Sequence, residues 1–459
     1  MTNPLSTDIA VIGAGTAGLT AFNAIKRAGA SALLIDRGPL GTTCARVGCM
    51  PSKAALHAGQ RWATARELRA EPKPQELVKP NDLWRHVRTT RDQLAHDAAE
   101  LTVEVAGDRL LMGEARFVAE NTLEVAGQRI SARAFILATG SRPVVPASLA
   151  ALGDRLLTTD TLFELETLPA SIGILGVGAV GLEMGLALAR LGVRVVGGDL
   201  KTTLAGIEDP EVRSRAIERF SRELTLWLGH EVEALAAGDR IELRSGGSKD
   251  SVDRVLAALG RAPNVEALDL AHVGVETDAQ ARFAIDPHTL RVGEAVIFMA
   301  GDVSPDRPLM HEAVDEGLIA ALGALQIVNG RQVTLPSRRT PISIVFSDPD
   351  IAAVGDGFDS LDHDRTVIGT AAGSTNGRSR ILGAEGNLVR IYVDRNSGVL
   401  RGASLIATHG EHLAHSLAWA VQRGETVDEL LRMPFYHPSV EEMIQTALKD
   451  VAHQLARAS

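Results

Sequence analysis

The chain has 459 residues, of which 45% are hydrophobic and 23% charged, with 44 glycines and only two cysteines. This length exceeds what one ordinary hydrophobic core holds and indicates three or four domains. The net charge of −10 offers no cationic surface to nucleic acid or to an anionic membrane, and no run of about 18 apolar residues predicts a membrane span. We therefore expect a cytoplasmic α/β protein that binds neither nucleic acid nor membrane.

The first predicted unit covers residues 8–36 and reads strand, glycine turn, helix, strand. Its GxGxxG motif is formed by Gly13, Gly15 and Gly18, and Asp36 follows 18 residues after the third glycine. Such glycines let backbone N–H groups face a pyrophosphate, and an acid at the end of the second strand can accept hydrogen bonds from a ribose. A tight turn without a ligand is the alternative, and we favour the dinucleotide site.

Both cysteines lie in the stretch LGTTCARVGCMPSK at residues 40–53, as Cys44 and Cys49. In a regular helix, residues five apart are about 8–9 Å apart at Cα, beyond the ~7 Å limit for a disulfide. The helix must therefore bend, which Gly48 makes easier. A disulfide across so short a loop adds little stability and is reducible. Both properties favour a redox-active disulfide over a structural one. Two unrelated buried thiols are the alternative.

Between the first glycine motif and a second one, the chain is predicted to hold a Pro-rich loop, EPKPQELVKP, a long helix from about Asp82 to Leu101, and hairpin strands near 109–131. A buried strand then ends in the turn AFILATGSRP. These elements separate the first glycine motif from a second one.

The second copy covers residues 171–199, with Gly176, Gly178 and Gly181 and an aspartate, Asp199, at the same spacing. A carboxylate at this strand end pairs with a free 2′-hydroxyl and repels a 2′-phosphate, which favours NAD over NADP. Lys201 and Arg194 are close in sequence and weaken that preference.

After the second copy come the strand-to-turn stretches RVLAALGRAPN and AVIFMAGDV and a helix that begins near Pro308. From about Pro341 the pattern changes to alternating antiparallel strands followed by two amphipathic helices, the last at about 439–456. This block predicts a separate α+β domain.

The motifs GAGTAG, TTCARVGCMPSK, ATGSRP, GVGAVGLE, GRAPN, AGD and HPSVEE, in this order, resemble the pyridine nucleotide-disulfide oxidoreductases, most closely the dihydrolipoyl dehydrogenase branch. The resemblance implies an α/β fold with two Rossmann-like dinucleotide-binding domains and a C-terminal α+β dimerisation domain. The implied domains are an FAD-binding domain at 1–148 and 268–339, an NAD-binding domain at 149–267 and a dimerisation domain at 340–459.

The resemblance also implies roles for single residues. Cys49 would be the thiol next to the flavin and would form a charge-transfer thiolate, whereas Cys44 would exchange with a substrate dithiol. Lys53 would lie near the flavin and pair with Glu183; the alternatives are a solvated cation and a structural carboxylate. The implied FAD contacts are Gly13, Gly15, Gly18, Asp36, Lys53, Ala115, Gly140 and Asp302, and the implied NAD contacts are Gly176, Gly178, Gly181 and Asp199, with Gly260 as a further cofactor contact. A helix N-terminus and the charge of Lys53 would lower a thiol pKa.

Oxidation of a dithiol releases protons, so a base that titrates near neutrality is required. His437, with Pro438 at the first helical position and Glu442 one turn in, is the candidate. Ser439 and Glu442 also read as a capping box, which is the alternative role for Glu442. In the resembling family this histidine comes from the other subunit of a homodimer.

The implied electron path runs from a carrier-bound dihydrolipoyl dithiol to the Cys44–Cys49 disulfide, to FAD and to NAD. Alternatives are a reductase of another small disulfide or a metal ion, an NADH diaphorase or transhydrogenase, and a non-catalytic assembly subunit. No metal site is expected. The chain departs from the family's HAHPT pattern at Phe435 and Ser439, which puts the identity of the disulfide substrate in doubt.

Overall fold

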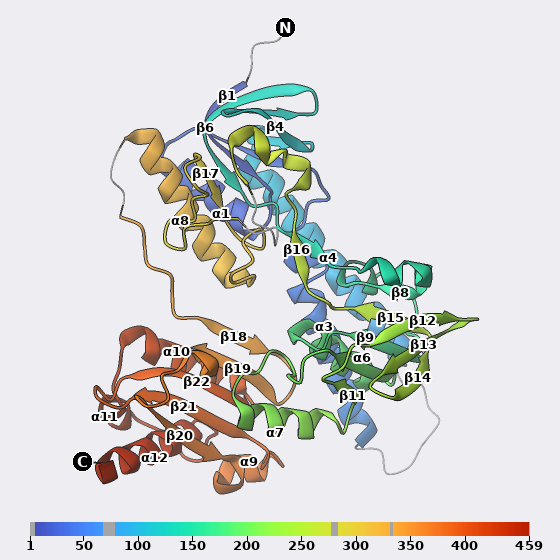
Figure 1. Cartoon of the computed structure of the whole chain (residues 1–459), viewed down its shortest axis with the longest axis vertical. Helices are drawn as coiled ribbons and strands as arrows, with labels where there is room; N and C mark the ends of the chain where they lie inside the picture. The colour runs from blue at the N-terminus through green and yellow to red at the C-terminus, as the bar shows by residue number, and fades with distance from the viewer. Residues whose placement is uncertain (1–4, 68–78, 277–282, 331–333, 459) are drawn as a thin grey trace. The chain divides into compact units, whose positions relative to one another are not determined.

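The computed structural model describes residues 5–67, 79–276, 283–330 and 334–458 (Figure 1). It divides into two compact units, each assembled from three stretches of chain. Unit 1 takes its residues from 1–51, 86–144 and 260–338, and unit 2 takes its residues from 52–85, 145–259 and 339–459. The predicted loop EPKPQELVKP lies almost wholly outside the described residues. The boundaries of the three predicted domains remain predictions.

Unit 1 is built on a mixed seven-stranded sheet in the order β3-β2-β1-β6-β5-β4, with β17 also paired to β6. Its strands are β1 (Leu5–Ile12), β2 (Ala32–Asp36), β3 (Leu110–Met112), β4 (Ala115–Ala119), β5 (Thr122–Val125), β6 (Gln128–Leu137) and β17 (Ile297–Met299). The pairs of β1 with β2 and β6 are parallel, whereas β4, β5 and the start of β6 form an antiparallel meander.

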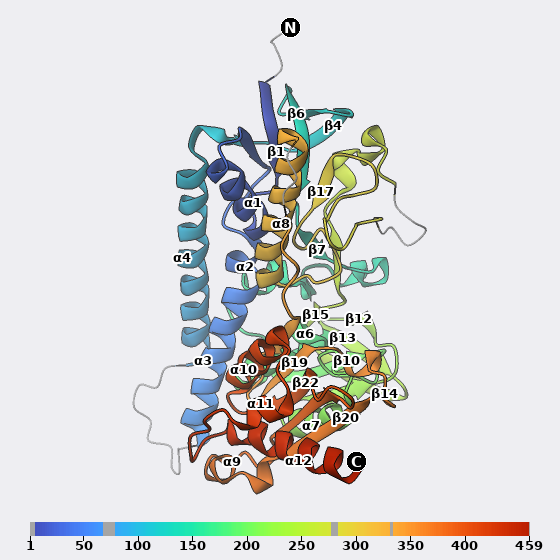
Figure 2. The ribbon, with the colours of Figure 1, turned by 90° about the vertical axis from the view of Figure 1, so that its left-hand side faces the viewer.

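The helices α1 (Thr16–Arg27) and α8 (Met310–Asn329) lie side by side in unit 1 (Figure 2). They share a core with β1, β2 and β6 that includes Phe22, Ile25 and Ala320. A second core, with Phe117 and Phe135 edge to face, involves the other set of strand side chains. The central strands are therefore apolar on both faces, as a parallel sheet requires.

Unit 2 holds a parallel sheet in the order β11-β10-β9-β15-β8 and a separate antiparallel sheet in the order β18-β19-β22-β21-β20. The parallel strands are β8 (Leu156–Leu157), β9 (Ser171–Leu175), β10 (Arg194–Asp199), β11 (Thr225–Leu228) and β15 (Arg254–Ala257), beside the small antiparallel sheet β12 (Glu233–Ala237), β13 (Arg240–Ser245) and β14 (Ser248–Val252). The C-terminal strands are β18 (Ile342–Val345), β19 (Asp350–Gly355), β20 (Thr366–Ala372), β21 (Leu388–Asp394) and β22 (Leu400–Ala407). Both predicted glycine-turn units and the predicted C-terminal α+β block are confirmed.

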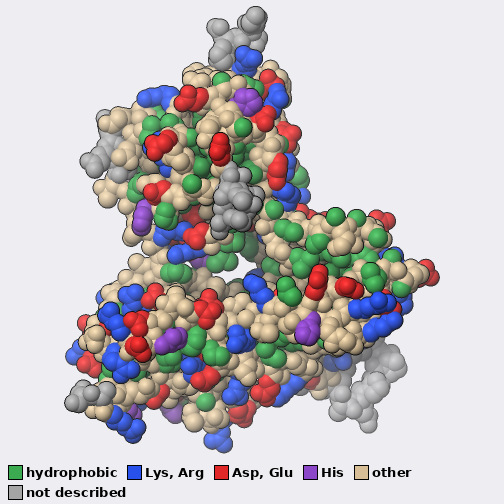
Figure 3. Space-filling model, viewed as in Figure 1, with side chains coloured by type: hydrophobic (Ala, Val, Ile, Leu, Met, Phe, Trp, Pro, Cys, Tyr) green, Lys and Arg blue, Asp and Glu red, His purple; other side chains and the backbone are tan. Residues whose placement is uncertain are grey.

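Helices in unit 2 include α6 (Ala179–Arg190) and α7 (Pro210–Phe220), with α10 (Gly410–Arg423), the short α11 (Val427–Leu431) and α12 (Glu442–Ala458) in the C-terminal block. The helix α4 (Pro80–Ala106) is longer at both ends than the predicted 82–101. Over the ranges described, no helix combines the length and apolarity needed to cross a membrane. Acidic and basic side chains are interspersed on the face shown in Figure 3.

Candidate functional site

The two cysteines lie on either side of a break between two helices. Thr42 accepts a hydrogen bond from the Ala45 N–H (3.1 Å) and caps α2 (Thr43–Arg46), and α3 (Cys49–Glu67) begins at Cys49. A Cβ on Gly48 would lie 3.0 Å from the Thr43 carbonyl oxygen, so a larger residue would crowd the break. The predicted bend between Cys44 and Cys49 is confirmed.

The thiols of Cys44 and Cys49 are in hydrogen-bond contact. This contact is the main reason that the pKa of the Cys44 thiol is raised, and burial adds to it. The direction is opposite to the lowered thiol pKa that the helix N-terminus and Lys53 led us to expect, because a thiol that shares its proton with a neighbouring sulfur resists ionisation. The proximity that a reversible disulfide needs is present.

The first glycine loop leaves open space at its middle position only. A Cβ on Gly13, whose φ is +106°, would lie 2.1 Å from the Ala138 carbonyl oxygen, and one on Gly18 would lie 1.8 Å from the Gly13 oxygen. A Cβ on Gly15 would meet nothing within 4 Å. The outer glycines are therefore required by the protein's own packing, whereas Gly15 leaves room for a phosphate group.

The second glycine loop repeats this pattern. A Cβ on Gly176 (φ +88°) would lie 2.5 Å from the Ala258 oxygen, one on Gly181 would lie 1.9 Å from the Gly176 oxygen, and one on Gly178 would meet nothing. Both loops thus have the cradle that a dinucleotide pyrophosphate fits.

Each of the two strand-end aspartates accepts a hydrogen bond from the glycine loop of the same motif. The Asp36 carboxylate accepts N–H groups of Ala14 (2.7 Å) and Gly38 (2.6 Å). The Asp199 carboxylate accepts N–H groups of Val177 (3.0 Å) and Lys201 (2.9 Å). The expected ribose contacts remain a prediction, and the bonds to the loops were missed because the sequence does not show which backbone groups approach a strand end.

Asp302 and Gly140 are brought together through Ser141. The Ser141 hydroxyl donates to the Asp302 carboxylate (3.1 Å), and it accepts from Arg261 Nε (2.7 Å). Ser141 belongs to β7 (Ser141–Pro143), which pairs with β16 (Arg261–Pro263) directly after Gly260. Gly140 and Gly260 both have positive φ, and a Cβ on either would meet no atom within 4 Å.

Ala115 lies near the strand end that carries Asp36. The strand β3 pairs Met112 with Asp36, and the Gly113 N–H donates to the Asp36 carbonyl oxygen (2.8 Å). Ala115 begins β4 two residues later and is buried. Its backbone is therefore placed at the same edge of the sheet as the first glycine loop.

The predicted pairing of Lys53 with Glu183 is confirmed. Lys53 Nζ lies 2.8 Å from Glu183 Oε2 and 2.9 Å from Oε1, and the glutamate side chain is only 6% exposed. The Phe346 N–H also donates to Glu183 (3.1 Å), and the Phe346 ring centroid lies 4.7 Å from Lys53 Nζ. Sequence reasoning missed Phe346, because it is 163 residues from Glu183 and carries no motif.

The predicted contact of His437 with Glu442 is also confirmed, and the local backbone differs from the prediction. His437 Nδ1 lies 3.0 Å from Glu442 Oε1. The helix α12 begins at Glu442 and not near Ser439, so Pro438 is not its first residue. Ser439 donates its N–H to Glu442 (3.0 Å) but its hydroxyl donates to the Tyr436 carbonyl oxygen (2.8 Å). Only half of the alternative capping box is present.

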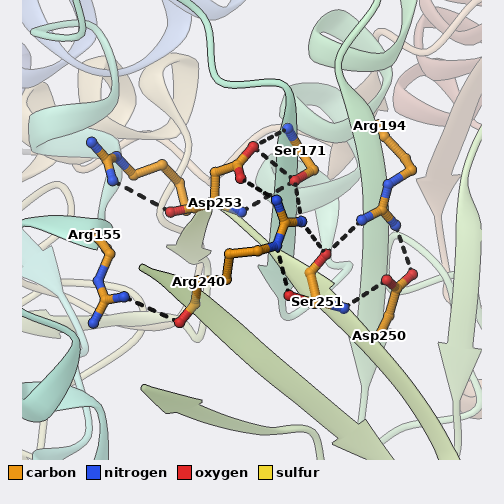
Figure 4. A network of polar contacts seen from close by, with 8 residues as sticks. Arg155, Ser171, Arg194, Arg240, Asp250, Ser251 and Asp253 are labelled. Atoms are coloured by element: carbon orange, nitrogen blue, oxygen red, sulfur yellow. Dashed lines mark hydrogen bonds and ion pairs between the residues drawn. The ribbon is translucent and has the colours of Figure 1, made fainter. Parts of the chain in front are cut away.

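Arg194 lies at the opposite end of β10 from Asp199, about 17 Å away at ~3.3 Å per strand residue. Its guanidinium donates to the Asp250 carboxylate (2.6 Å) and to the Ser251 carbonyl oxygen (2.6 Å). Figure 4 shows these bonds in a network with Arg240. Arg194 is therefore not available to a 2′-phosphate at the Asp199 end. It no longer weakens the predicted preference for NAD over NADP.

Two dinucleotide-type glycine loops and a cysteine pair at a helix break define a protein that couples dinucleotides to dithiol chemistry. The family model "Pyridine nucleotide-disulphide oxidoreductase" matches residues 7–317, and the dimerisation-domain model of that family matches residues 342–448. The chain belongs to the pyridine nucleotide-disulphide oxidoreductases, which bind FAD and use NAD(P).

Several proteins are similar to this chain over nearly its whole length. A dihydrolipoyl dehydrogenase of Halobacterium salinarum is 29% identical, with 98% of this chain and 97% of that protein covered. One of Geobacillus stearothermophilus is 27% identical, with 96% of each covered. Among solved structures, LpdA from Mycobacterium tuberculosis has a TM-score of 0.83 at 24% identity, with 96% of this chain and 99% of that chain covered.

The fold is also shared with the HOCl-induced flavoprotein disulfide reductase RclA from Escherichia coli, with a TM-score of 0.82 at 20% identity. That match covers 96% of this chain and 99% of that chain. At these identities the structural matches show the fold, and the substrate has to be argued from the site.

Proposed function

We propose that this protein is a dihydrolipoyl dehydrogenase, which oxidises a protein-bound dihydrolipoyl dithiol with NAD⁺. The observation that carries the proposal is the contact between the Cys44 and Cys49 thiols at the start of α3. The curated relatives of this length that bear the name dihydrolipoyl dehydrogenase support the substrate class.

The dithiol step uses side chains of this chain. One thiolate of the substrate attacks Cys44 of the oxidised pair and displaces Cys49 as a thiolate. The second substrate sulfur then attacks the mixed disulfide, which releases the cyclic disulfide and leaves Cys44 reduced. Two electrons and two substrate protons have then been transferred, with one proton on Cys44 and the other on a base.

His437 is the proposed base. With Glu442 at Nδ1, the Nε2 atom is the nitrogen that can accept the substrate proton. We propose that this pair comes from the second copy of the chain in a homodimer, in line with the match to the dimerisation domain.

The glycine loops at Gly15 and Gly178 are the proposed seats of FAD and NAD, respectively, and Lys53 is the proposed cation beside the flavin. Bound FAD would supply the two-electron chemistry that links the reduced cysteines to NAD⁺. The ion pair with Glu183 holds the Lys53 side chain in place.

A reductase of another small disulfide is the second candidate. The observation that favours it is Tyr436, which directly precedes the proposed base and is 84% exposed. A large exposed aromatic side chain at this position departs from the HAHPT pattern, whereas Phe435 packs against the C-terminal core.

The test is an anaerobic titration of the purified flavoprotein with dihydrolipoamide, followed by NADH formation under steady state. We expect a long-wavelength absorbance band of a thiolate beside oxidised flavin, and its loss in Cys49→Ser. Cys44→Ser, the matched control, should retain the band and lose turnover. Turnover with glutathione disulfide and NADH but not with dihydrolipoamide would replace the proposed substrate by the second candidate.

A further inference from the structure

A buried carboxylate holds the turn that carries Asp302. Glu316 in α8 is 1% exposed, and its Oε2 accepts the Gly301 N–H at 2.7 Å. Its Oε1 accepts a hydrogen bond from Arg338 Nη2, also at 2.7 Å. Since Gly301 directly precedes Asp302, Glu316 connects α8 to the turn in which Asp302 lies.

The Gly301–Asp302 turn is closely packed, which restricts its backbone conformation. Gly301 has φ +77°, and a Cβ on it would lie 3.0 Å from the Ala17 Cβ. A Cβ on Gly317 would lie 2.4 Å from the Ala17 carbonyl oxygen. The helix α8 therefore packs on α1, the helix that follows the first glycine loop. A shift of Glu316 would displace the Gly301–Asp302 turn and would also disturb the contact of α8 with α1.

Charged groups surround Glu316 unevenly. Arg338 also bonds Glu312 (3.0 Å) and Asp306 (2.8 Å), and Arg307 donates to Glu312 (3.3 Å). Three carboxylates thus face two guanidinium groups.

The α1 residues that Gly301 and Gly317 approach, Ala17 and Thr20, are uncharged. Burial raises the pKa of Glu316 to about 7, although the Gly301 N–H and Arg338 act in the opposite direction.

We propose that Glu316 is a positioning residue for the cofactor: its carboxylate fixes the Gly301–Asp302 turn and thereby sets the affinity for FAD. The inference rests on the proposed role of Asp302 as an FAD contact. Both oxygens of Glu316 accept hydrogen bonds, so a proton on either one weakens the bond to Gly301 or the bond to Arg338. FAD affinity should therefore fall as the pH drops and Glu316 takes up a proton.

The experiment measures FAD dissociation from the holoenzyme by the increase in flavin fluorescence on dilution, at pH 6 and pH 8. Glu316→Ala should raise the Kd for FAD about tenfold or more at pH 8, because the Gly301 N–H loses its acceptor. Glu312→Gln is the matched control, since it alters the same ion cluster but leaves the Gly301 N–H with its acceptor, and it should stay within about threefold. The wild type should bind more weakly at pH 6 than at pH 8, whereas Glu316→Gln, which keeps an acceptor oxygen and cannot titrate, should show a flat profile.

Equal FAD affinity in the wild type and Glu316→Ala would overturn the proposal, and so would an equal loss in Glu312→Gln. If Glu316→Ala does not fold, the pH profile of Glu316→Gln decides: a profile parallel to that of the wild type overturns the proposal. A protein that binds FAD as described but does not oxidise dihydrolipoamide would count against the proposed function alone.

Discussion

His437 Nδ1 lies 3.0 Å from one oxygen of Glu442 and 3.2 Å from the other. The same carboxylate accepts the Ser439 N–H, and this bond, followed by the one to His437, lowers the pKa of Glu442. Glu442 therefore stays ionised across the neutral range. An anion at Nδ1 keeps the ring proton on that atom and leaves Nε2 to act as the base.

From this geometry we expect that His437→Gln lowers the rate of dihydrolipoamide oxidation by about 10²- to 10⁴-fold, the range that a general base contributes. Glu442→Gln should cost about 10²-fold, since it releases the ring orientation but keeps the imidazole. The measurement is kcat for NADH formation from pH 6 to pH 9. Ser439→Ala keeps the backbone N–H and removes only the hydroxyl bond to Tyr436, so it should stay near the wild-type rate. A Glu442→Gln variant that keeps the wild-type rate would contradict the role of Glu442 in orienting His437 and leave it only its bond to the Ser439 N–H.

The contact between the two thiols predicts how Cys44 reacts in the reduced protein. Because the bond to Cys49 is the largest cause of the raised pKa of Cys44, Cys49→Ala should lower that pKa while burial still keeps it above the usual value. More thiolate is then present at pH 8, so Cys44 should be alkylated faster by iodoacetamide. Mass spectrometry of the Cys44 peptide over time measures the rate. A slower reaction in Cys49→Ala than in the reduced wild type would contradict this account.

The sequence was sufficient for features whose cause is local. The two outer glycines of each loop are needed within one turn, and Gly48 lies at the break between adjacent helices, so their spacing identified these elements. Phe346 and Tyr392 could not be found in this way, because each meets its acidic partner across more than 160 residues of chain. The start of α12 was misplaced because the Ser439 hydroxyl bonds backward to Tyr436 and not to the helix. Local sequence patterns thus predicted the turns. The contacts made by side chains distant in sequence depend on long-range packing, which these patterns do not show.

The middle glycines allow each dinucleotide site to be tested separately. Gly15→Ala should keep the fold, since its Cβ meets no protein atom, but it should reduce FAD retention about tenfold, which corresponds to about 1.4 kcal/mol. Gly178→Ala should retain FAD and raise the KM for NADH by a similar factor. Flavin absorbance and NADH kinetics on both variants make each the control for the other. Gly18→Ala, whose Cβ would lie 1.8 Å from the Gly13 oxygen, should instead prevent folding. Loss of NADH binding but not of FAD in Gly15→Ala would reverse the assignment of the two loops.

Coenzyme choice should depend on Asp199 and not on Arg194. Asp199→Asn removes the negative charge at the strand end, so the ratio of kcat/KM for NADPH to that for NADH should rise about tenfold. Arg194→Met breaks bonds to Asp250 and Ser251 at the other end of β10 and should leave the ratio within about twofold. Steady-state kinetics with both coenzymes give the ratio. A change of equal size in Arg194→Met would show that the guanidinium reaches the coenzyme after all.

A buried cluster between α7 and β21 should matter for the stability of unit 2. Asp209, fully buried, accepts hydrogen bonds from Arg390 Nε and from the Tyr392 hydroxyl, both at 2.8 Å, and it also caps α7. Burial raises the pKa of Tyr392, so its hydroxyl remains a donor at working pH. Tyr392→Phe should lower the free energy of unfolding by about 1–2 kcal/mol, as for a lost bond to a charged group.

Asp209→Ala should cost more, about 3–5 kcal/mol, because it leaves Arg390 buried with less compensation. Urea unfolding followed by the fluorescence of tryptophan measures both variants. The control is Arg365→Met, which breaks an exposed ion pair with Asp394 on the same strand and should cost less than about 0.5 kcal/mol. If Tyr392→Phe unfolds at the same urea concentration as the wild type, the hydroxyl bond contributes nothing and the cluster is held by Arg390 and the helix cap alone.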